Sequence, residues 1–234
     1  MSPKLPMELI FDGNFVVLIA IFMDAIVLEN VEVTTEALVQ KGMDKGMSYE
    51  DYRFLMDTLA QEGRATGQET SEAEVNYTLL NQRRMKRLDK TLKINEEFTE
   101  RILGFDQVKV TWLVLTESWC GDAAQVLPMI NKVAALNDNI TLKIILRDEN
   151  LDIMNRFLTQ GAMSIPKLIM VNNASGEILG EWGSRPKIAE QLVSDFKNQY
   201  GALTPEFKEE LQVWYNADKG QSILTDLLDL LSLE

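Results

Sequence analysis

The stretch TESWCGDAAQVLP, residues 116–128, contains the chain's single cysteine, Cys120. Trp119 precedes it, and the apolar residues that follow recur at helical spacing. A helix start offers free N–H groups and a favourable dipole, so a cysteine there is usually a better thiolate, and hence a better nucleophile, than a free one. We therefore expect Cys120 to be the catalytic residue of any thiol chemistry, with an inert cysteine that acts as a small buried hydrophobe as the alternative. A second cysteine at position 123 would resolve a mixed disulfide, but that residue is Ala123, so release requires an external thiol.

Composition excludes several other classes of function. The 234 residues are 46% hydrophobic, which is enough to form a core. With no histidine, Ser-His-Asp and Cys-His mechanisms and the commonest metal ligand are absent, and we expect no metal site and no cofactor. The formal net charge of −13 repels phosphate backbones and anionic membranes, so we expect neither nucleic acid nor a membrane as partner. A lone cysteine fits a reducing compartment, which predicts a cytoplasmic protein.

Residues 1–33 form an apolar N-terminal extension. Its core, NFVVLIAIFM at 14–23, lies between Asp12 and Asp24. That run is shorter than the roughly 20 residues of a membrane-spanning helix, and we interpret it as a buried strand or helix, with a membrane anchor as the alternative.

Residues 34–104 are interpreted as a helical region. Capping residues predict a helix from Ser48 to Gly63, a second from about 71 to 90, and a third from Asn95 to Gly104. The second helix contains a basic run, RRMKRLDK, whose Arg83, Arg87 and Lys90 we expect to form a solvated face that pairs with nearby acids, in preference to a nucleic-acid patch. Its expected core positions are Val75, Leu79, Met85 and Leu88.

Residues 105–201 follow a β-α-β-α-β-β-α pattern, with a parallel pair of strands followed by an antiparallel hairpin. The expected strands are 108–116, 140–147, 166–171 and 177–182, and the expected helices are 122–136, 149–161 and 186–200. Residues 202–234 are expected to form C-terminal helices, in which a leucine-rich stripe packs on its own domain, with a dimer contact as the alternative. The stripe comprises Ile223, Leu227, Leu230 and Leu231.

Residues 108 to about 200 resemble the thioredoxin fold. SWCGDA stands where thioredoxins carry a tryptophan followed by C-G-P-C, Pro128 where their helix is kinked, and SIP, residues 164–166, where they have a cis-proline. The chain is further similar to bacterial thioredoxin-like proteins with a W-C-G-D-A motif, a MSYEDYR-like leader, an RDEN segment and a WYNADKG-like tail. The resemblance implies an α/β fold with a mixed central sheet of about four strands and flanking helices, to which the N-terminal extension and the C-terminal helices are added.

This topology brings several segments to one edge of the sheet. The first two strands end there, the third begins there and the fourth ends there, which is the expected place for a site in an open α/β sheet. By the resemblance, a cis-Pro166 presents the backbone of Ile165 to an extended peptide. The expected substrate-binding residues are Trp119, Gly121, Asp122, Arg147, Ile165, Pro166, Gly183 and Arg185.

The sequence predicts where these residues lie more clearly than what each of them does. Arg147 or Arg185 would stabilise a thiolate and Glu117 and Asp122 would oppose it, and the sequence leaves the balance open. Trp119 belongs either to the substrate surface or to the packing. For Asp122, stabilising the first helical turn is favoured over proton transfer.

The first functional hypothesis is a monothiol protein that exchanges thiols and disulfides through Cys120, with a protein or a low-molecular-weight thiol or disulfide as substrate. Thioredoxins often bury an aspartate six residues before this cysteine, and here that residue is Val114. The alternative is a catalytically inactive thioredoxin-fold module that binds a peptide or client protein. A cluster-holding monothiol glutaredoxin is a weaker idea, because the C-G-F-S motif is missing.

Overall fold

The computed structural model describes residues 33–67 and 70–232. The predicted apolar stretch at 14–23 lies outside the described residues. The chain divides into two units, Met1–Thr34 and Thr35–Glu234, and the fold described below is that of the second. Among residues 33–67 and 70–232, no helix combines the length and apolar character that crossing a membrane would need.

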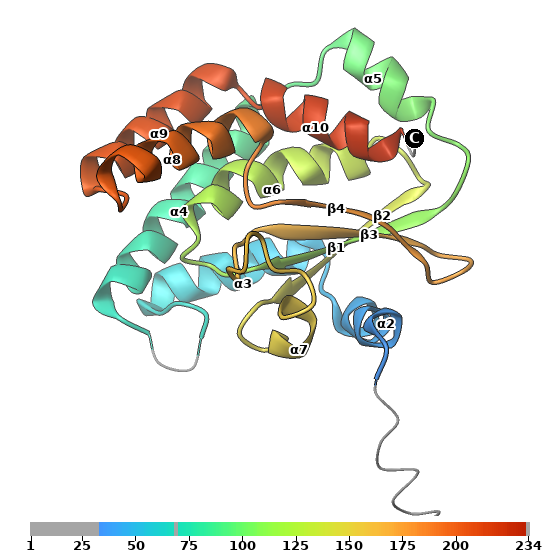
Figure 1. The fold of residues 1–234 in the computed structure, drawn as a ribbon, viewed down its shortest axis with the longest axis horizontal. Coiled ribbons are helices and arrows are strands. Elements are labelled where there is room, and N and C mark those ends of the chain that lie inside the picture. Colours follow the sequence, from blue (N-terminus) through green and yellow to red (C-terminus); the bar gives the residue numbers. More distant parts are fainter. Residues whose placement is uncertain (1–32, 68–69, 233–234) are drawn as a thin grey trace, which may run out of the picture. The chain divides into compact units, whose positions relative to one another are not determined.

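A four-stranded mixed sheet organises the second unit (Figure 1). Strand β1 (Val110–Thr116) lies between β2 (Ile140–Leu146), which runs parallel to it, and β3 (Lys167–Asn172), which is antiparallel. Strand β4 (Ile178–Gly183) pairs with β3, which gives the order β2-β1-β3-β4. Every residue of β1 is buried, as its β-branched and apolar sequence predicts for a strand covered on both faces. The mixed α/β fold predicted from the sequence is confirmed.

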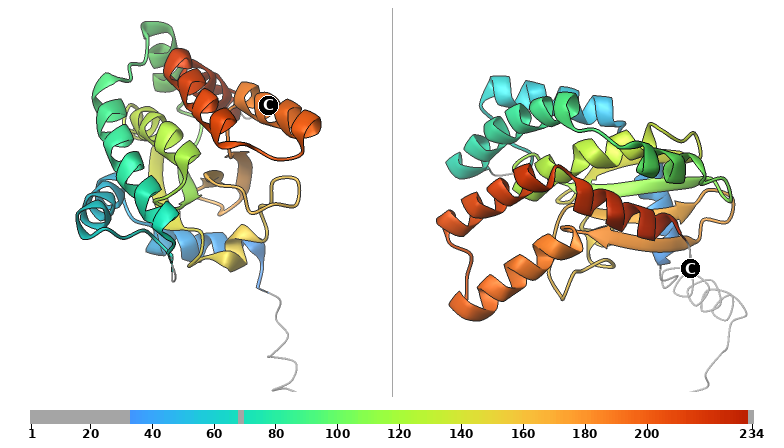
Figure 2. Two further views of the ribbon diagram at one scale, coloured as in Figure 1. Left: turned by 90° about the vertical axis from the view of Figure 1, so that its left-hand side faces the viewer. Right: turned by 90° about the horizontal axis from the view of Figure 1, so that it is seen from above.

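Helices cover both faces of this sheet (Figures 1 and 2). Helices α6 (Gly121–Ala134) and α10 (Gln221–Leu231) lie over one face, and α2 (Thr35–Lys45) and the short α7 (Leu151–Met154) lie over the other. Helix α4 (Glu72–Thr91) runs beside α6, and α3 (Tyr49–Glu62) packs between α4 and β2. The remaining helices are α5 (Glu96–Leu103), α8 (Lys187–Tyr200) and α9 (Pro205–Asp218).

Local signals in the sequence place most of these boundaries. Ser48 and Asp51 form a capping box at the start of α3, which ends at Gly63 in the left-handed region with a φ of 65°. A second capping box, between Ser71 and Glu74, starts α4. In α10, Ile223, Leu227 and Leu231 are buried and Leu230 is half-buried, so the predicted packing of this stripe on its own domain is confirmed.

Two predictions about helices are wrong. The helix expected over 149–161 stops at Met154, and the chain then turns at Gln160 and Gly161, whose φ values of 51° and 79° are left-handed, between the bridged residues Thr159 and Ala162. In α4, Met85 and Leu88 are buried as expected, but Leu79 is exposed and Val75 is only half-buried. Thr78 and Asn81 face inward instead, because both side chains bond to Ser118.

Candidate functional site

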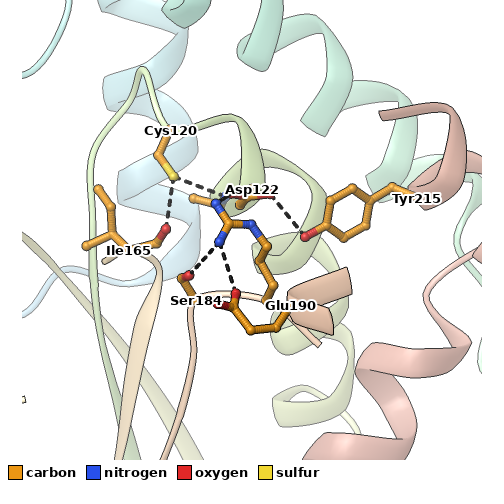
Figure 3. A network of polar contacts seen from close by, with 8 residues as sticks. Cys120, Asp122, Ile165, Ser184, Glu190 and Tyr215 are labelled. Atoms are coloured by element: carbon orange, nitrogen blue, oxygen red, sulfur yellow. Dashed lines mark hydrogen bonds and ion pairs between the residues drawn. The ribbon is translucent and has the colours of Figure 1, made fainter. Parts of the chain in front are cut away.

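Cys120 is the N-cap residue of α6, and its sulfur faces the start of β3 (Figure 3). The Cys120 Sγ donates to the backbone oxygen of Ile165 over 3.3 Å and accepts from the N–H of Ala123 over 3.4 Å. The Ile165–Pro166 peptide bond is cis, as the resemblance implies. The sheet topology thus brings residues 45 positions apart into direct contact.

The Cys120 thiol is protonated in this environment. The residue is only 7% exposed, and burial raises the pKa of the thiol to about 12, with a further contribution from the charge of Asp122. The N–H groups of Ala123 and Asp122 and the cation of Arg185 lower this pKa, but by less. The expectation that the helix start makes Cys120 a better thiolate is therefore wrong for this conformation. The sequence left open whether nearby charges would raise or lower the pKa of the thiol, and the effect of Asp122, which raises it, exceeds that of Arg185.

Asp122 is the centre of a buried polar network (Figure 3). Its Oδ2 pairs with Arg185 Nη2 over 2.7 Å, and its Oδ1 accepts from the Tyr215 hydroxyl over 3.1 Å. Burial raises the pKa of Asp122, while Arg185 opposes that shift. Arg185 also donates to Glu190 over 3.0 Å, so it joins the start of α6 to α8. With both oxygens engaged, Asp122 is better placed to hold the helix start than to transfer protons.

Arg147 and Trp119 form a second pair beside the cysteine. The guanidinium of Arg147 lies 5.0 Å from the centroid of the Trp119 ring, within the range of a cation–π contact. Its Nε donates to Asp148 over 2.8 Å. Arg147 is thus engaged by its neighbours, and of the two candidate arginines it is Arg185 that acts on the pKa of Cys120.

Gly183 closes the site from the β4 side. It lies opposite Lys167 in the β3–β4 ladder and has a φ of 116°, in the region that favours glycine. A Cβ at this position would overlap the carbonyl oxygen of Pro166. The close approach of the two backbones therefore requires glycine at position 183. The structure thus brings most of the predicted site residues together at one edge of the sheet, with the Trp119–Arg147 pair beside them. The residues at this edge are Cys120, Gly121, Asp122, Ile165, Pro166, Gly183 and Arg185.

A family model described as "Thioredoxin" matches residues 67–197, more than half of the chain. This chain belongs to the thioredoxin-like superfamily. Two crystal structures are similar to it at a TM-score of 0.55 each: a protein of unknown function from Pseudomonas aeruginosa, 18% identical, and an HIV epitope scaffold, 19% identical. Each alignment covers 82% of this chain, and 95% and 96% of the two structures respectively. No curated protein matches.

The likeness to both structures lies in the fold, and the narrower resemblance to proteins with a W-C-G-D-A motif stays a prediction. In the described residues of this thioredoxin-like chain, no group of three or more acidic or sulfur ligands is arranged to hold a metal ion.

The sequence did not reveal a buried hydroxyl cluster around Ser118, two residues before Cys120. Ser118 Oγ accepts from the N–H of Thr66 over 2.9 Å and lies 2.7 Å from Thr78 Oγ1. Asn81 Nδ2 donates to the Ser118 carbonyl over 2.9 Å. The cluster fastens α4 and the segment before it to the cysteine loop of the thioredoxin-like domain.

Tyr215 and Gln212 of α9 were also missed. Tyr215 donates to Asp122, and Gln212 Oε1 accepts from Gln125 Nε2 of α6 over 2.8 Å. Tyr215 lies in the WYNADKG-like tail that the sequence resemblance included, but that resemblance assigned no function to the tyrosine. Residues from outside the predicted domain thus cover the start of α6.

Proposed function

We propose that this thioredoxin-like chain exchanges thiols and disulfides through the single cysteine Cys120. The observation that carries the proposal is the contact of the Cys120 sulfur with the Ile165 carbonyl, at the strand start where the superfamily holds an extended substrate. Among the described residues, none accepts a hydrogen bond from the N–H of Ile165. That N–H is therefore left to pair with a substrate backbone laid beside the segment that precedes β3, since β3 itself is paired on both sides.

The exchange would proceed in two steps. The Cys120 thiolate, after losing its proton to solvent, attacks one sulfur of a disulfide, so that a Cys120–substrate disulfide forms and the other sulfur leaves as a thiolate. An external thiolate then attacks this mixed disulfide, taking the substrate sulfur and returning Cys120 as a thiolate. The substrate is a protein or low-molecular-weight disulfide, and we place the exchange in a reducing compartment such as the cytoplasm.

The raised pKa slows this chemistry without abolishing it. A shift from 9.0 to about 12 leaves roughly a thousandfold fewer thiolates at neutral pH. Each thiolate is in turn more nucleophilic, because nucleophilicity rises with the pKa of the thiol with a Brønsted coefficient of about 0.4–0.5. Over this shift in pKa, the rate constant of the thiolate therefore increases by a factor of roughly 16–32. The exchange rate at neutral pH is therefore on the order of 30- to 60-fold lower than that of an ordinary thiol, before access to the buried sulfur is considered.

Mass spectrometry of the intact protein tests this proposal. After incubation with hydroxyethyl disulfide at pH 8 to 9, we expect one mercaptoethanol adduct on Cys120 that dithiothreitol removes, and no adduct on a Cys120→Ser variant. The denatured chain, in which the thiol is accessible, serves as the positive control. If the denatured chain is modified within minutes and the folded chain shows no adduct after hours, Cys120 is not an exchange residue.

A second candidate is a binding module without redox turnover, and the burial of Cys120 favours it. In that case the thiol is a small core residue whose S–H satisfies the Ile165 carbonyl. The two functions differ in their need for sulfur. A partner that binds the Cys120→Ser variant with unchanged affinity supports the binding module, whereas a partner held only through a bond that reductant breaks supports exchange.

A further inference from the structure

An open pocket lies beyond the cysteine site, where β4 leads into α8 (Figure 1). Its volume is about 380 Å³, which is within the usual range of small-ligand pockets. Gly183 and Arg185 border both this pocket and the cysteine site. The remaining wall comes from β4, α8, the turn at Gln160 and Asp226 of α10. A helix from outside the segment that matches the thioredoxin family therefore contributes to the pocket.

The carboxylate of Asp226 has one oxygen engaged and one oxygen without a partner. Its Oδ2 accepts from Trp182 Nε1 over 3.0 Å and from the N–H of Lys187 over 2.9 Å. Lys187 begins α8, and because the N-cap Pro186 makes no side-chain capping bond, Asp226 supplies this cap from α10. No described residue donates to Oδ1, which is not a fully enclosed atom. Since Asp226 is only 6% exposed and lines the pocket, it presents Oδ1 there.

The two bases in the pocket wall are already compensated by acids. Arg185 pairs with Glu190 over 3.0 Å and with a second carboxylate, at the start of α6, over 2.7 Å. Lys187 Nζ pairs with Asp229 over 2.8 Å. The bond to Asp229 and its charge raise the pKa of Lys187, and the charge of Asp226 adds to them. Among the described residues, no base forms an ion pair of its own with Asp226.

Bases that lack an acid partner lie away from this pocket. Within the described ranges no acid pairs with Arg83, Arg87 or Lys90, contrary to the expectation for the basic run of α4, and none of the three lines the pocket. Glu181 adds a further carboxylate to the wall, and its nearest base is Lys167 at 3.6 Å. The pocket therefore has an excess of negative charge, in a chain whose net charge is −13.

We propose that this pocket binds an organic cation, an ammonium or guanidinium group, with Asp226 Oδ1 as its main acceptor. Such a group would donate a charge-assisted hydrogen bond to the carboxylate, and Glu181 would attract it at longer range. The bonds of Oδ2 already fix the Asp226 side chain, so binding costs little of its conformational freedom. A lysine or arginine side chain of a protein and a free amine share this chemistry. The proposal does not depend on exchange at Cys120.

The indole N–H of Trp182 reports on the occupant, because it donates to the same carboxylate. The experiment is an NMR titration of the full-length chain with N-acetyl-lysine-N-methylamide, which carries an ammonium on a blocked backbone. A Trp182→Phe variant assigns the indole resonance. We expect a saturable shift of this resonance, and none with N-acetylnorleucine-N-methylamide, which has the same side chain without its amino group.

A further probe, n-butylamine, distinguishes the two sources of the cation. This probe carries the ammonium and the alkyl chain without the peptide groups. Weaker binding of n-butylamine than of the blocked lysine assigns the pocket to a protein side chain, and equal or tighter binding assigns it to a free amine. Both results support a cation site.

Variants separate the pocket from the general attraction of an acidic chain for cations. We expect Asp226→Asn to weaken binding of the blocked lysine about tenfold and Glu181→Gln about threefold. The matched control is Glu177→Gln, which removes the same charge from an exposed position in the β3–β4 connection, outside the pocket, and should leave the affinity unchanged. Thermal melts verify that each variant is folded. If Asp226→Asn does not fold, the comparison of Glu181→Gln with Glu177→Gln decides.

Three results would overturn the proposal. They are the absence of a saturable shift with the blocked lysine, equal affinity for the norleucine derivative, and equal losses for the Glu177→Gln and Glu181→Gln variants. None of these measurements involves Cys120, so their outcome is independent of the reaction with hydroxyethyl disulfide.

Discussion

Two opposing forces act on Cys120, and their magnitudes decide the state of the sulfur. A charge at a helix terminus is stabilised by about 0.3–1 kcal/mol in exposed settings. The rise of the pKa from 9.0 to about 12 corresponds to roughly 4 kcal/mol in favour of the thiol. Desolvation by the covering side chains therefore outweighs the helix start, and the nearby Asp122 acts in the same direction.

We expect the pH profile of Cys120 alkylation to reveal this shift. The rate of iodoacetamide labelling should rise about tenfold per pH unit from pH 7 to pH 10 and reach no plateau, because the thiolate fraction keeps growing until the pH approaches the raised pKa. The urea-denatured chain, with an ordinary thiol, should level off near pH 9 to 10. A plateau of the folded protein below pH 9 would contradict a buried, protonated thiol. Quantitative mass spectrometry of the labelled protein measures both curves.

Neutralising Asp122 should make the sulfur more reactive. In an Asp122→Asn variant, the carboxylate charge that raises the pKa of Cys120 is gone and the opposing charge of Arg185 is no longer offset at close range. We predict that iodoacetamide labels this variant roughly five- to tenfold faster at pH 8. Asp138→Asn, a change at an exposed acid, is the control. An unchanged or slower rate in a variant that melts cooperatively would show that Asp122 does not set the thiol's protonation.

At the scale of elements, the cysteine loop is held by α4 as well as by the sheet. Ser118 accepts from the Thr66 N–H and pairs with the Thr78 hydroxyl, and Asn81 donates to its carbonyl. All four residues are buried, so their polar groups depend on one another rather than on water. Helix α4, which precedes the first strand in the sequence, is thus part of the site's framework.

Removing the Ser118 hydroxyl should destabilise the fold. A Ser118→Ala change leaves the buried Thr66 N–H without its acceptor and the Thr78 hydroxyl without its hydrogen-bond partner, at about 1–3 kcal/mol for each group. We expect urea denaturation to show a loss of roughly 2–4 kcal/mol in the free energy of unfolding, and a smaller loss of about 1 kcal/mol for Thr78→Val. Ser194→Ala, at a helix position with no bond from its hydroxyl to any described residue, should change the value by less than about 0.5 kcal/mol. A Ser118→Ala variant as stable as the parent would mean that the cluster does not hold the loop.

At the scale of the whole molecule, the core extends past the segment that matches the thioredoxin family. The match ends at residue 197, but α10 buries Ile223, Leu224, Leu227, Leu228 and Leu231. Asp226 of α10 is also buried and accepts from Trp182 Nε1 of β4 over 3.0 Å and from the N–H of Lys187 over 2.9 Å. The C-terminal helices are therefore part of the domain's hydrophobic core and not a surface addition to it.

Truncation after residue 201 should abolish the stable fold. Five buried apolar side chains contribute about 1.5–3 kcal/mol each, or roughly 7–15 kcal/mol, which equals the whole stability of a typical domain. We expect the truncated chain to be aggregated or to lack a cooperative thermal transition by circular dichroism. In the full chain, Leu227→Ala should cost about 3 kcal/mol, whereas Val213→Ala, at an exposed position, should cost little. A truncated chain with an unchanged melting temperature would contradict this assignment.

Much of the fold followed from local sequence patterns. Capping boxes at Ser48 and Ser71 and the apolar run of β1 determine where elements begin and which are buried, because these effects act over a few residues. The parallel pair, the antiparallel hairpin and the location of the site at one sheet edge followed from the order of the elements and from the resemblance. The local pattern failed for Leu79, because the bonds of Thr78 and Asn81 to the distant Ser118 turn another face of the helix inward. It also failed for the helix expected at 149–161, which is replaced after Met154 by a turn.

The sequence by itself determined that a single sulfur stands at a strand–helix junction without a resolving cysteine. Only the tertiary structure decided that this sulfur is a buried thiol bonded to Ile165, and that Arg84, Gln212 and Tyr215 surround the start of its helix. The physical reason is that charge balance and desolvation depend on distance in space. Gln212 and Tyr215 are separated from Cys120 by about 90 residues along the chain, and no local pattern encodes their approach.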